Sequence, residues 1–182
     1  MSPTLIVVAG PPGSGKTTLA RRLAEGLHCP LLSRDEVREG LLLGRAVADE
    51  DLGAIAMQAN RAFFDVAGQL LSRSVSVVIE AAFQHHLWAP ELEPLLPLAA
   101  IRVVRCRIDP ALALRRMAAR LDDAPWRQGL HPDREYLDRQ TRLDPGRATF
   151  DAIHIDQPTL DIDTTASYRP ALDSVLAFIQ QR

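Results

Sequence analysis

The sequence predicts an α/β fold in which helices pack against a parallel β-sheet. Short apolar runs with the composition of buried strands alternate along the chain with segments of helical periodicity, the pattern of repeated strand–helix–strand units. The chain has 182 residues, a length typical of one domain, and no repeat, low-complexity tract or long linker divides it. We therefore expect residues 1–182 to form a single domain.

The first predicted strand leads into a glycine-rich turn. An apolar run over 5–9 stops at Gly10, residues 10–17 fit G-x-x-x-x-G-K-[ST], and a helical pattern begins at once. Strand, glycine-rich turn and helix together indicate a phosphate-binding loop, because glycines let backbone N–H groups surround phosphate oxygens and the helix points its positive end at them. The residues expected to bind the phosphates are Gly10, Pro11, Gly13, Ser14, Gly15, Lys16, Thr17 and Thr18.

Lys16 is the single lysine among the 21 basic residues of the chain; all the others are arginine. A compact ammonium fits among phosphates where a planar guanidinium would not, so Lys16 is expected to contact the β- and γ-phosphates and to act in catalysis. The Thr17 hydroxyl is placed to bind Mg²⁺. The alternative, a chance match in a glycine-rich turn, leaves the flanking strand and helix unexplained.

A second strand is predicted over 30–33, followed by a helix that begins near residue 34. Ligands of open parallel sheets bind at the carboxyl ends of the strands, so Asp35 and Arg38 should lie beside the phosphate loop. Asp35 is a candidate general base that accepts a proton from an attacking hydroxyl. Arg38 shares its helical face and could hold a phosphate or carboxylate of the acceptor. Alternatively, Asp35 caps the helix and Arg38 is solvated.

A third strand is predicted over 74–82, after a long helix that begins near residue 51 and ends near residue 72. Its near-continuous apolar run ends at Glu80, and a buried carboxylate is costly unless it serves an ion or a hydrogen bond. Glu80 is therefore expected to contact substrate or to position Mg²⁺ through water. The alternative places Glu80 just past the buried part of the strand.

The aromatic segment after this strand is a candidate acceptor pocket. Phe83, with His86 and Trp88, could line it, since ligand sites are often aromatic. The adjacent histidines at 85 and 86 do not share a helical face, and no third ligand is suitably spaced, so zinc is not expected.

A fourth strand is predicted over 100–108, and the residue pattern gives no account of its arginines at 102, 105 and 107. Asp109 and Pro110 then start a helix on which Arg116 and Arg120 share a face. The turn-rich segment that follows suggests a lid at about 116–131, which would bring both arginines to the nucleotide phosphates and exclude water on closing. The alternative is a solvated, arginine-rich helix.

The remainder of the chain completes the sheet. The pattern predicts a helix over 132–143, a fifth strand over 152–156 and a short addition at an exposed edge over 159–164. A last helix is expected to begin at Pro170.

Charge and cysteine content exclude some classes of function. The net charge is −2 and the pI about 6.2, so tight non-specific binding to long nucleic acid is not expected. Cys29 and Cys106 lie far apart and outside any metal-binding spacing, which is typical of reduced thiols. No signal peptide or membrane segment is predicted, so we expect a cytoplasmic protein.

The loop at 10–17, the segment 33–38, Glu80 and the pair Arg116 and Arg120 occur in an order that resembles P-loop kinases of the AAA_33 type. That group is similar to phage polynucleotide kinase, chloramphenicol phosphotransferase, zeta-toxin-type kinases, and gluconate and shikimate kinases. The resemblance covers nearly the whole chain. It implies a P-loop NTPase fold: a three-layer sandwich with a five-stranded parallel sheet of order 2-3-1-4-5 and helices on both faces.

The resemblance also implies the chemistry. It implies an ATP- and Mg²⁺-dependent kinase in which Lys16 and Thr17 bind phosphates and Mg²⁺, Asp35 is the base, Arg38 grips the acceptor, and Arg120 with Arg116 meets the phosphates. This chain has Glu80 where the family more often has Asp, and it lacks the arginine often found just after that strand. We therefore expect a small-molecule acceptor; a 5′-hydroxyl polynucleotide kinase and a non-catalytic nucleotide switch are the alternatives. No N-K-x-D sequence is present to indicate GTP.

Overall fold

The computed structural model describes residues 2–43, 51–123, 133–142 and 150–181. The strands are β1 (Thr4–Ala9), β2 (Leu31–Ser33), β3 (Val77–Ala81), β4 (Ala100–Arg107) and β5 (Thr159–Asp163). The α-helices are α1 (Lys16–Leu27), α2 (Arg34–Leu42), α3 (Leu52–Ser72), α4 (His85–Leu92), α5 (Pro110–Asp123), α6 (Asp133–Arg142) and α7 (Leu172–Gln180). A 3₁₀ helix spans Glu93–Leu98, where prolines prevent regular α-helix.

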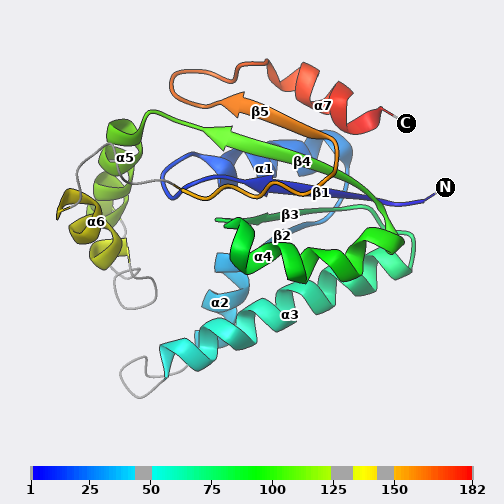
Figure 1. The fold of residues 1–182 in the computed structure, drawn as a ribbon, viewed down its shortest axis with the longest axis horizontal. Coiled ribbons are helices and arrows are strands. Elements are labelled where there is room, and N and C mark those ends of the chain that lie inside the picture. The colour runs from blue at the N-terminus through cyan, green and yellow to red at the C-terminus, as the bar shows by residue number, and fades with distance from the viewer. Residues whose placement is uncertain (1, 44–50, 124–132, 143–149, 182) are drawn as a thin grey trace.

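The five strands form one parallel sheet in the order β2-β3-β1-β4-β5, which confirms the predicted topology (Figure 1). Register places Ser33 of β2 opposite Glu80 of β3, and Glu80 opposite Val8 of β1. The carboxyl ends of these three strands therefore meet at one edge of the sheet, next to the turn that begins at Gly10. In Figure 1, α5 and α6 lie beyond this same edge.

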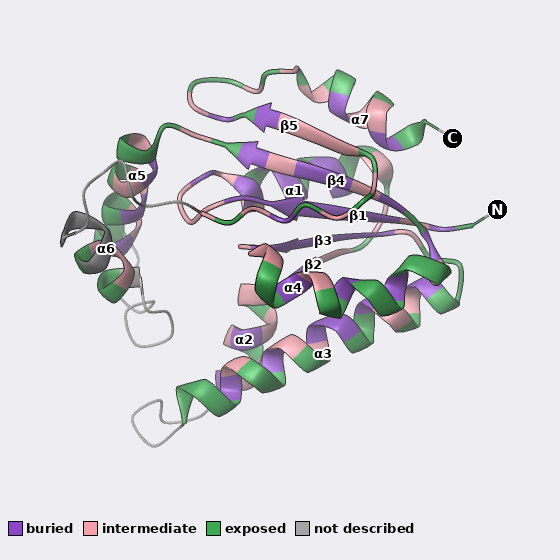
Figure 2. Cartoon of the chain, in the orientation of Figure 1, coloured by how far each residue is buried: buried purple, intermediate pink, exposed green. Residues whose placement is uncertain are grey.

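Alternation along β1 divides the core into two layers. Leu5, Val7 and Ala9 pack with apolar side chains of α3 and α4, whereas Ile6 and Val8 pack with those of α1 and α7. Both faces of the central strands are therefore buried, as Figure 2 shows in purple. This arrangement confirms the three-layer sandwich.

The fifth strand is not where the sequence pattern placed it. The segment 152–156 contributes only a single antiparallel bridge, between Ala152 and Gln84, whereas β5 at 159–163 pairs along its whole length with β4. The apolar side chain of Ile153 is nevertheless fully buried, which explains why the pattern resembled a strand. The last helix begins at Leu172, two residues after the predicted start at Pro170.

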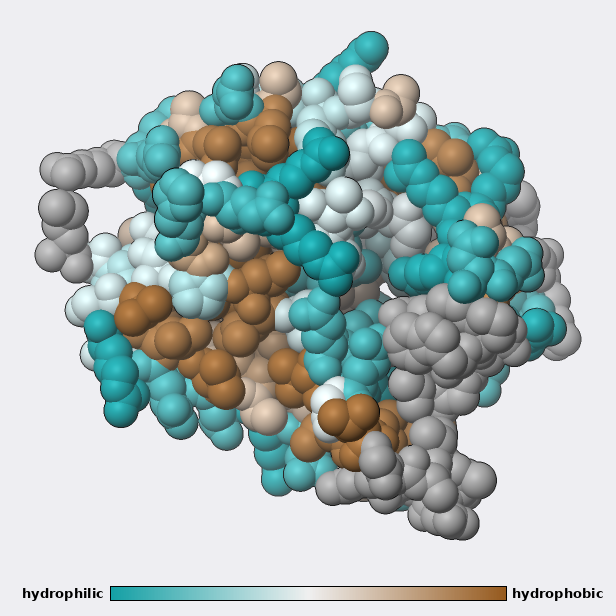
Figure 3. Space-filling view, turned by 180° about the vertical axis from the view of Figure 1, so that it is seen from behind, coloured by the Kyte–Doolittle hydropathy of each residue, from teal (hydrophilic) through white to brown (hydrophobic). Residues whose placement is uncertain are grey.

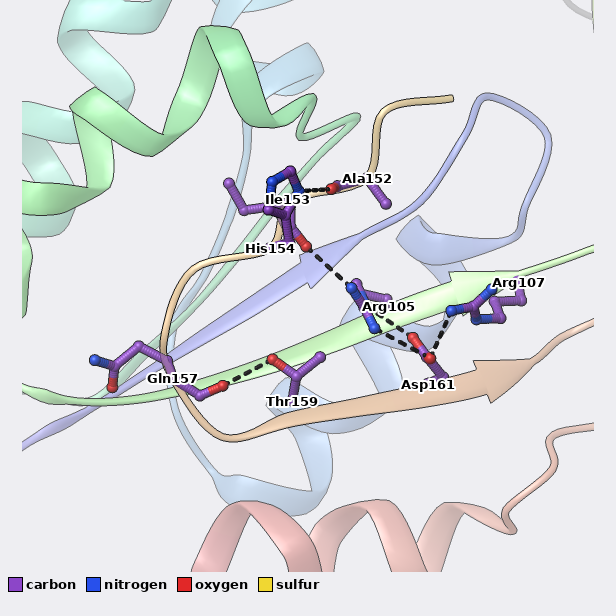
Figure 4. Close-up of polar contacts among 8 residues, drawn as sticks. All are labelled: Arg105, Arg107, Ala152, Ile153, His154, Gln157, Thr159 and Asp161. Carbon is purple, nitrogen blue, oxygen red and sulfur yellow. Dashed lines mark hydrogen bonds and ion pairs between the residues drawn. The ribbon is translucent and has the colours of Figure 1, made fainter. Parts of the chain in front are cut away.

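The arginines of β4 are explained by β5. Arg105 donates from Nε and Nη2 to the Asp161 carboxylate, at 2.7 and 3.1 Å, and Arg107 donates to Asp161 Oδ2 at 2.7 Å (Figure 4). Arg105 Nη1 also donates to the carbonyl oxygen of Ile153 at 3.4 Å. Arg102 donates to the carbonyl oxygen of Gln181 at 2.6 Å. These charged groups therefore fix the outer strand and the segment before it.

The surface carries scattered apolar side chains. Among the described residues, Leu43, Met57 and Leu87 are the most exposed of the large ones, and they lie just after α2, in α3 and in α4. Figure 3 shows hydrophilic residues separating the apolar clusters on the face seen from behind. Within the described ranges, every helix is too short or too polar to cross a membrane.

Candidate active site

The turn after β1 is a tight backbone loop that α5 approaches closely. Gly13 and Gly15 have φ values of +79° and +78°, a conformation that L side chains rarely adopt. A Cβ on Gly13 would lie 2.3 Å from the carbonyl oxygen of Ala113 in α5, so only glycine fits there. A Cβ on Gly15 would meet only Arg116 Nη1, at 3.8 Å. The side of Gly15 where a Cβ would stand therefore faces Arg116.

Thr164, just after β5, ties this loop to the sheet. The Thr164 hydroxyl is the donor to the carbonyl oxygens of Ser14, at 2.7 Å, and Arg107, at 3.0 Å. Ser14 is fully buried, and its Oγ has no partner among the described residues. An unsatisfied buried hydroxyl in a left-handed glycine loop, at the start of α1, suits a phosphate oxygen.

Lys16 and Glu80 face each other at the end of the sheet. Lys16 Nζ lies 3.8 Å from Glu80 Oε1, and Ser33 Oγ donates to Glu80 Oε2 at 3.0 Å. Glu80 is 3% exposed, so the structure excludes the alternative in which it lies past the buried part of β3. Burial raises the pKa of Glu80, and the nearby Asp35 carboxylate adds to this; Lys16 and the Ser33 and Thr17 hydroxyls oppose it.

These contacts join residues from three parts of the chain. Lys16 and Thr17 begin α1, Asp35 lies in the first turn of α2, and Glu80 lies in β3. Asp35 is half-buried and close enough to act on the charge of Glu80. The structure therefore brings together the predicted phosphate-binding lysine, the predicted base and the strand carboxylate. The Thr17 hydroxyl and the Glu80 carboxylate are oxygen groups of the kind that Mg²⁺ prefers, and either could hold the ion, Glu80 through water.

Arg38 is buried rather than solvated. It is 7% exposed, and its Nε has no hydrogen-bond partner among the described residues. Burial lowers the pKa of Arg38, the Arg34 charge lowers it further, and Asp35 raises it.

Phe83 is a core residue. Its ring is fully buried and packs against Phe63 and Trp88, with ring centroids 6.3 and 5.4 Å away. Trp88 is also buried, whereas His86 is exposed and lies 3.2 Å from the Asp151 carboxylate. A fully buried ring presents no surface to a substrate, so the predicted aromatic acceptor pocket is not formed in this structure.

The predicted lid is described only in part. Of the range 116–131, residues 124–131 lie outside the described residues. Arg116 Nη2 donates to the carbonyl oxygens of Thr164 and Thr165, at 3.2 and 2.9 Å. Arg120 is half-buried on the same helix. Arg116 thus lies beside the phosphate loop, while contact of either arginine with nucleotide stays a prediction.

Several residues around the site were missed by the sequence reasoning. Thr164 lies some 150 positions from Ser14 in the chain, and a lone threonine after an edge strand gives no signal. Ser33 could have been noticed as the last residue of β2. Asn60, on α3, accepts from Arg34 at 3.0 Å although no sequence pattern singled it out. In the described ranges, there is no cluster of three or more His, Cys, Asp or Glu side chains that could hold a metal ion.

Comparison with known proteins agrees with this fold. The model of the AAA domain family AAA_33 matches residues 5–143. A cytidylate kinase of Aeropyrum pernix is 27% identical over 92% of this chain and 96% of its own. A cytidylate kinase of Methanothrix thermoacetophila is 30% identical over 50% of this chain, a match that spans 55% of that protein.

A similar fold occurs in a crystal structure of an inferred kinase from Chloroflexus aurantiacus. The TM-score is 0.79 and the identity 23%, with 100% of this chain and 98% of the other covered. That likeness concerns the fold, whereas the family match rests on sequence. The chain therefore belongs to the AAA_33 family of AAA domains, and its relatives by sequence make it a P-loop kinase.

Proposed function

We propose that this protein is an ATP- and Mg²⁺-dependent phosphotransferase that moves the γ-phosphate to a hydroxyl group of a small molecule. The observation that carries the proposal is the position of Asp35. This carboxylate lies at the carboxyl end of β2 and acts electrostatically on Glu80, which in turn faces Lys16. A base within reach of the phosphate loop is what a hydroxyl acceptor requires.

Each residue of the site has its own role in the proposed reaction. The backbone of the glycine loop and Lys16 hold the β- and γ-phosphates, and Asp35 accepts the proton of the acceptor hydroxyl. The hydroxyl oxygen bonds to the γ-phosphorus as the bond from that phosphorus to the β–γ bridging oxygen breaks, so that ADP leaves with the electron pair. Arg116 and Arg120 on α5 would neutralise charge on the transferred group.

Mg²⁺ would be held by the Thr17 hydroxyl together with phosphate oxygens, and Glu80 would act on it through water. When bound, the ion neutralises phosphate charge. Ser33 orients the Glu80 carboxylate for that contact through its 3.0 Å hydrogen bond.

A nucleotide is the second candidate acceptor. The Aeropyrum pernix relative, which aligns over nearly its whole length, is named a cytidylate kinase. An acceptor of that class would receive the phosphoryl group on a phosphate oxygen, which needs no general base. Dependence of turnover on Asp35 therefore separates the two classes.

The test is Asp35→Asn in the full-length protein. Phosphoryl transfer should fall at least about 100-fold, because general-base catalysis contributes that much or more. ATP affinity should be unchanged, since Asp35 does not belong to the loop. Asp65→Asn, which alters an exposed carboxylate on α3, is the matched control and should keep wild-type turnover.

Unchanged turnover in Asp35→Asn would remove the proposed base and favour a phosphate acceptor. If wild-type protein binds ATP but phosphorylates no acceptor, a nucleotide-dependent switch becomes the better account. A 5′-hydroxyl oligonucleotide belongs in the acceptor panel, with affinity measured against salt, because a polynucleotide kinase would show strong salt dependence.

A further inference from the structure

Thr164 reaches the phosphate loop with its side chain alone. The residue is 6% exposed and follows directly after β5. Its backbone N–H donates to the carbonyl oxygen of Arg107 at 2.9 Å, which continues the pairing of β5 with β4. Its hydroxyl has one proton, shared between that same oxygen at 3.0 Å and the carbonyl oxygen of Ser14 at 2.7 Å. The shorter contact, to Ser14, therefore depends entirely on the hydroxyl.

The contact with Ser14 gives the loop a directional constraint. In the described part of the chain, it is the one hydrogen bond that joins residues 10–15 to a segment beyond α1. Elsewhere the loop is constrained by close packing, as at Gly13, where a Cβ would clash with the carbonyl oxygen of Ala113. Packing limits the space of the loop, whereas the hydrogen bond sets the orientation of one of its peptide units.

The Ser14 carbonyl belongs to the same peptide unit as the N–H of Gly15. This peptide is trans, so it is planar and its oxygen and N–H point in opposite directions. Because the Thr164 hydroxyl holds the oxygen towards the ends of β4 and β5, the Gly15 N–H is directed away from the sheet, where a phosphate would lie. The first bond of α1 runs from the Leu19 N–H to the Gly15 carbonyl, so the helix offers the Gly15 N–H no acceptor.

The strand that carries Thr164 is fixed independently of the loop. Arg107 donates to Asp161 Oδ2 at 2.7 Å, and Arg105 donates to both oxygens of the same carboxylate (Figure 4). These ion pairs hold β5 against β4 and thereby set the position of the Thr164 hydroxyl. A loop that is oriented by a separately fixed element is preorganised, which lowers the cost of binding its ligand.

We propose that Thr164 is a positioning residue for nucleotide binding. Through the Ser14 carbonyl, its hydroxyl fixes the Gly15 N–H in the direction in which this group donates to a phosphate of ATP, and it acts without touching the nucleotide. The inference rests on the proposed function for its ligand, a nucleoside triphosphate, and is independent of the acceptor and of the base. Because coupling between sites is reciprocal, phosphate bound in the loop stabilises the end of β5.

Thr164→Val in the full-length protein tests the role of the hydroxyl, because it removes the donor and keeps the backbone N–H that pairs with Arg107. Calorimetry with Mg²⁺ present measures the Kd of a non-hydrolysable ATP analogue and of tripolyphosphate, which has neither base nor ribose. Thr164→Val should weaken both ligands about three- to tenfold, the range expected for one lost hydrogen bond. An equal loss for the two ligands shows that the hydroxyl acts on the phosphates.

Two variants serve as controls. Thr164→Ser keeps the donor and should bind both ligands as wild type does. Thr159→Val, at the other end of β5, removes a hydroxyl that donates to the carbonyl oxygen of Gln157 at 2.8 Å, and it should also bind as wild type does. Urea unfolding measures the stability of each variant. A hydroxyl with a merely structural role would lower the free energy of unfolding in Thr164→Val and leave the Kd values of the folded protein unchanged.

A measurement on wild type does not depend on the folding of any variant. Saturating tripolyphosphate should slow amide exchange over 161–164 more than in α7, because the bound phosphates stabilise the contact between the loop and Thr164. Exchange over 161–164 that slows no more than in α7 would contradict the proposed coupling.

Four binding results overturn the inference: unchanged Kd values in Thr164→Val, weaker binding of the ATP analogue alone, failure of Thr164→Ser to retain binding, and wild type that does not bind tripolyphosphate. The failures are distinguishable from those of the proposed function. If Asp35→Asn abolishes turnover while Thr164→Val binds both ligands normally, only the role of Thr164 is wrong. If Thr164→Val weakens both ligands but wild type phosphorylates no hydroxyl compound, only the proposed transfer is wrong.

Discussion

At the residue scale, Glu80 shows how burial and chemistry compete in this site. The carboxylate lies inside a strand, 3% exposed, where an ionised group is costly. Lys16 and Ser33 compensate only in part, because burial still raises the pKa of Glu80. The protein keeps an unfavourable group at the point where a metal–nucleotide complex would need an oxygen ligand, which is typical of functional residues.

The raised pKa of Glu80 makes the stability of the protein depend on pH. A carboxyl whose folded pKa is raised binds more protons in the folded state, so stability falls as pH rises above the ordinary value of 4.5 and through the folded pKa. Glu80→Gln removes this titration. The free energy of unfolding of Glu80→Gln minus that of wild type should therefore increase as pH rises across that window. Leaving Lys16 without its carboxylate adds an offset to this difference that does not change with pH.

Urea unfolding at a series of pH values, without nucleotide or metal, measures this trend. Glu91→Gln, at an exposed position on α4, controls for the loss of one surface carboxyl. A difference between Glu80→Gln and wild type that stays constant with pH would contradict the argument.

The position of a residue could be predicted where the residue belongs to a local pattern, although its role stays a prediction. Lys16 and Asp35 come shortly after strands and Glu80 lies near the end of one, so their meeting at one edge of the sheet could be predicted. Asn60 and Thr164 act through contacts across the fold, and nothing near them in sequence indicates those contacts. Phe83 was misread because an aromatic residue after a strand can face either a pocket or the core.

At the element scale, the edge strand β5 depends on charge as much as on apolar packing. Burial raises the pKa of Asp161, but the hydrogen bonds from Arg107 and Arg105 outweigh it and hold the pKa below its ordinary value. Only Ile162 in this strand is buried. The weaker apolar pattern explains why the sequence favoured 152–156 as the fifth strand.

Asp161→Ala should therefore loosen β5. The ion pairs are partly exposed, so we expect a loss of about 1–2 kcal/mol in the free energy of unfolding, at the lower end for charged hydrogen bonds. Faster amide exchange in β5 than in β1 would show that the loss is local. Asp156→Ala, at an exposed position before the strand, is the control; equal stability of the two variants would show that the arginine contacts do not hold the strand.

At the scale of the whole molecule, alternating apolar strands and helices predict a parallel sheet, and the resemblance adds the order of the strands. The strand pairing confirms both, and the burial of both faces of β1 explains why helices lie on each side of the sheet. The order also explains the site: β2, β3 and β1 are adjacent, so their carboxyl ends bring Asp35, Glu80 and the glycine loop together. The acceptor cannot be inferred from the fold, since one fold serves many substrates.

Transfer of a labelled γ-phosphate from ATP to a panel of acceptors tests the central claim most directly. The panel should contain hydroxylated phosphate esters, hydroxy acids, neutral alcohols, nucleoside monophosphates and a 5′-hydroxyl oligonucleotide, each with wild type and Asp35→Asn. The account predicts labelled phosphomonoester from a small hydroxyl compound of the panel with wild type, and at least about 100-fold less with Asp35→Asn. Label transferred to no hydroxyl compound, by a protein that binds ATP and Mg²⁺, would contradict it.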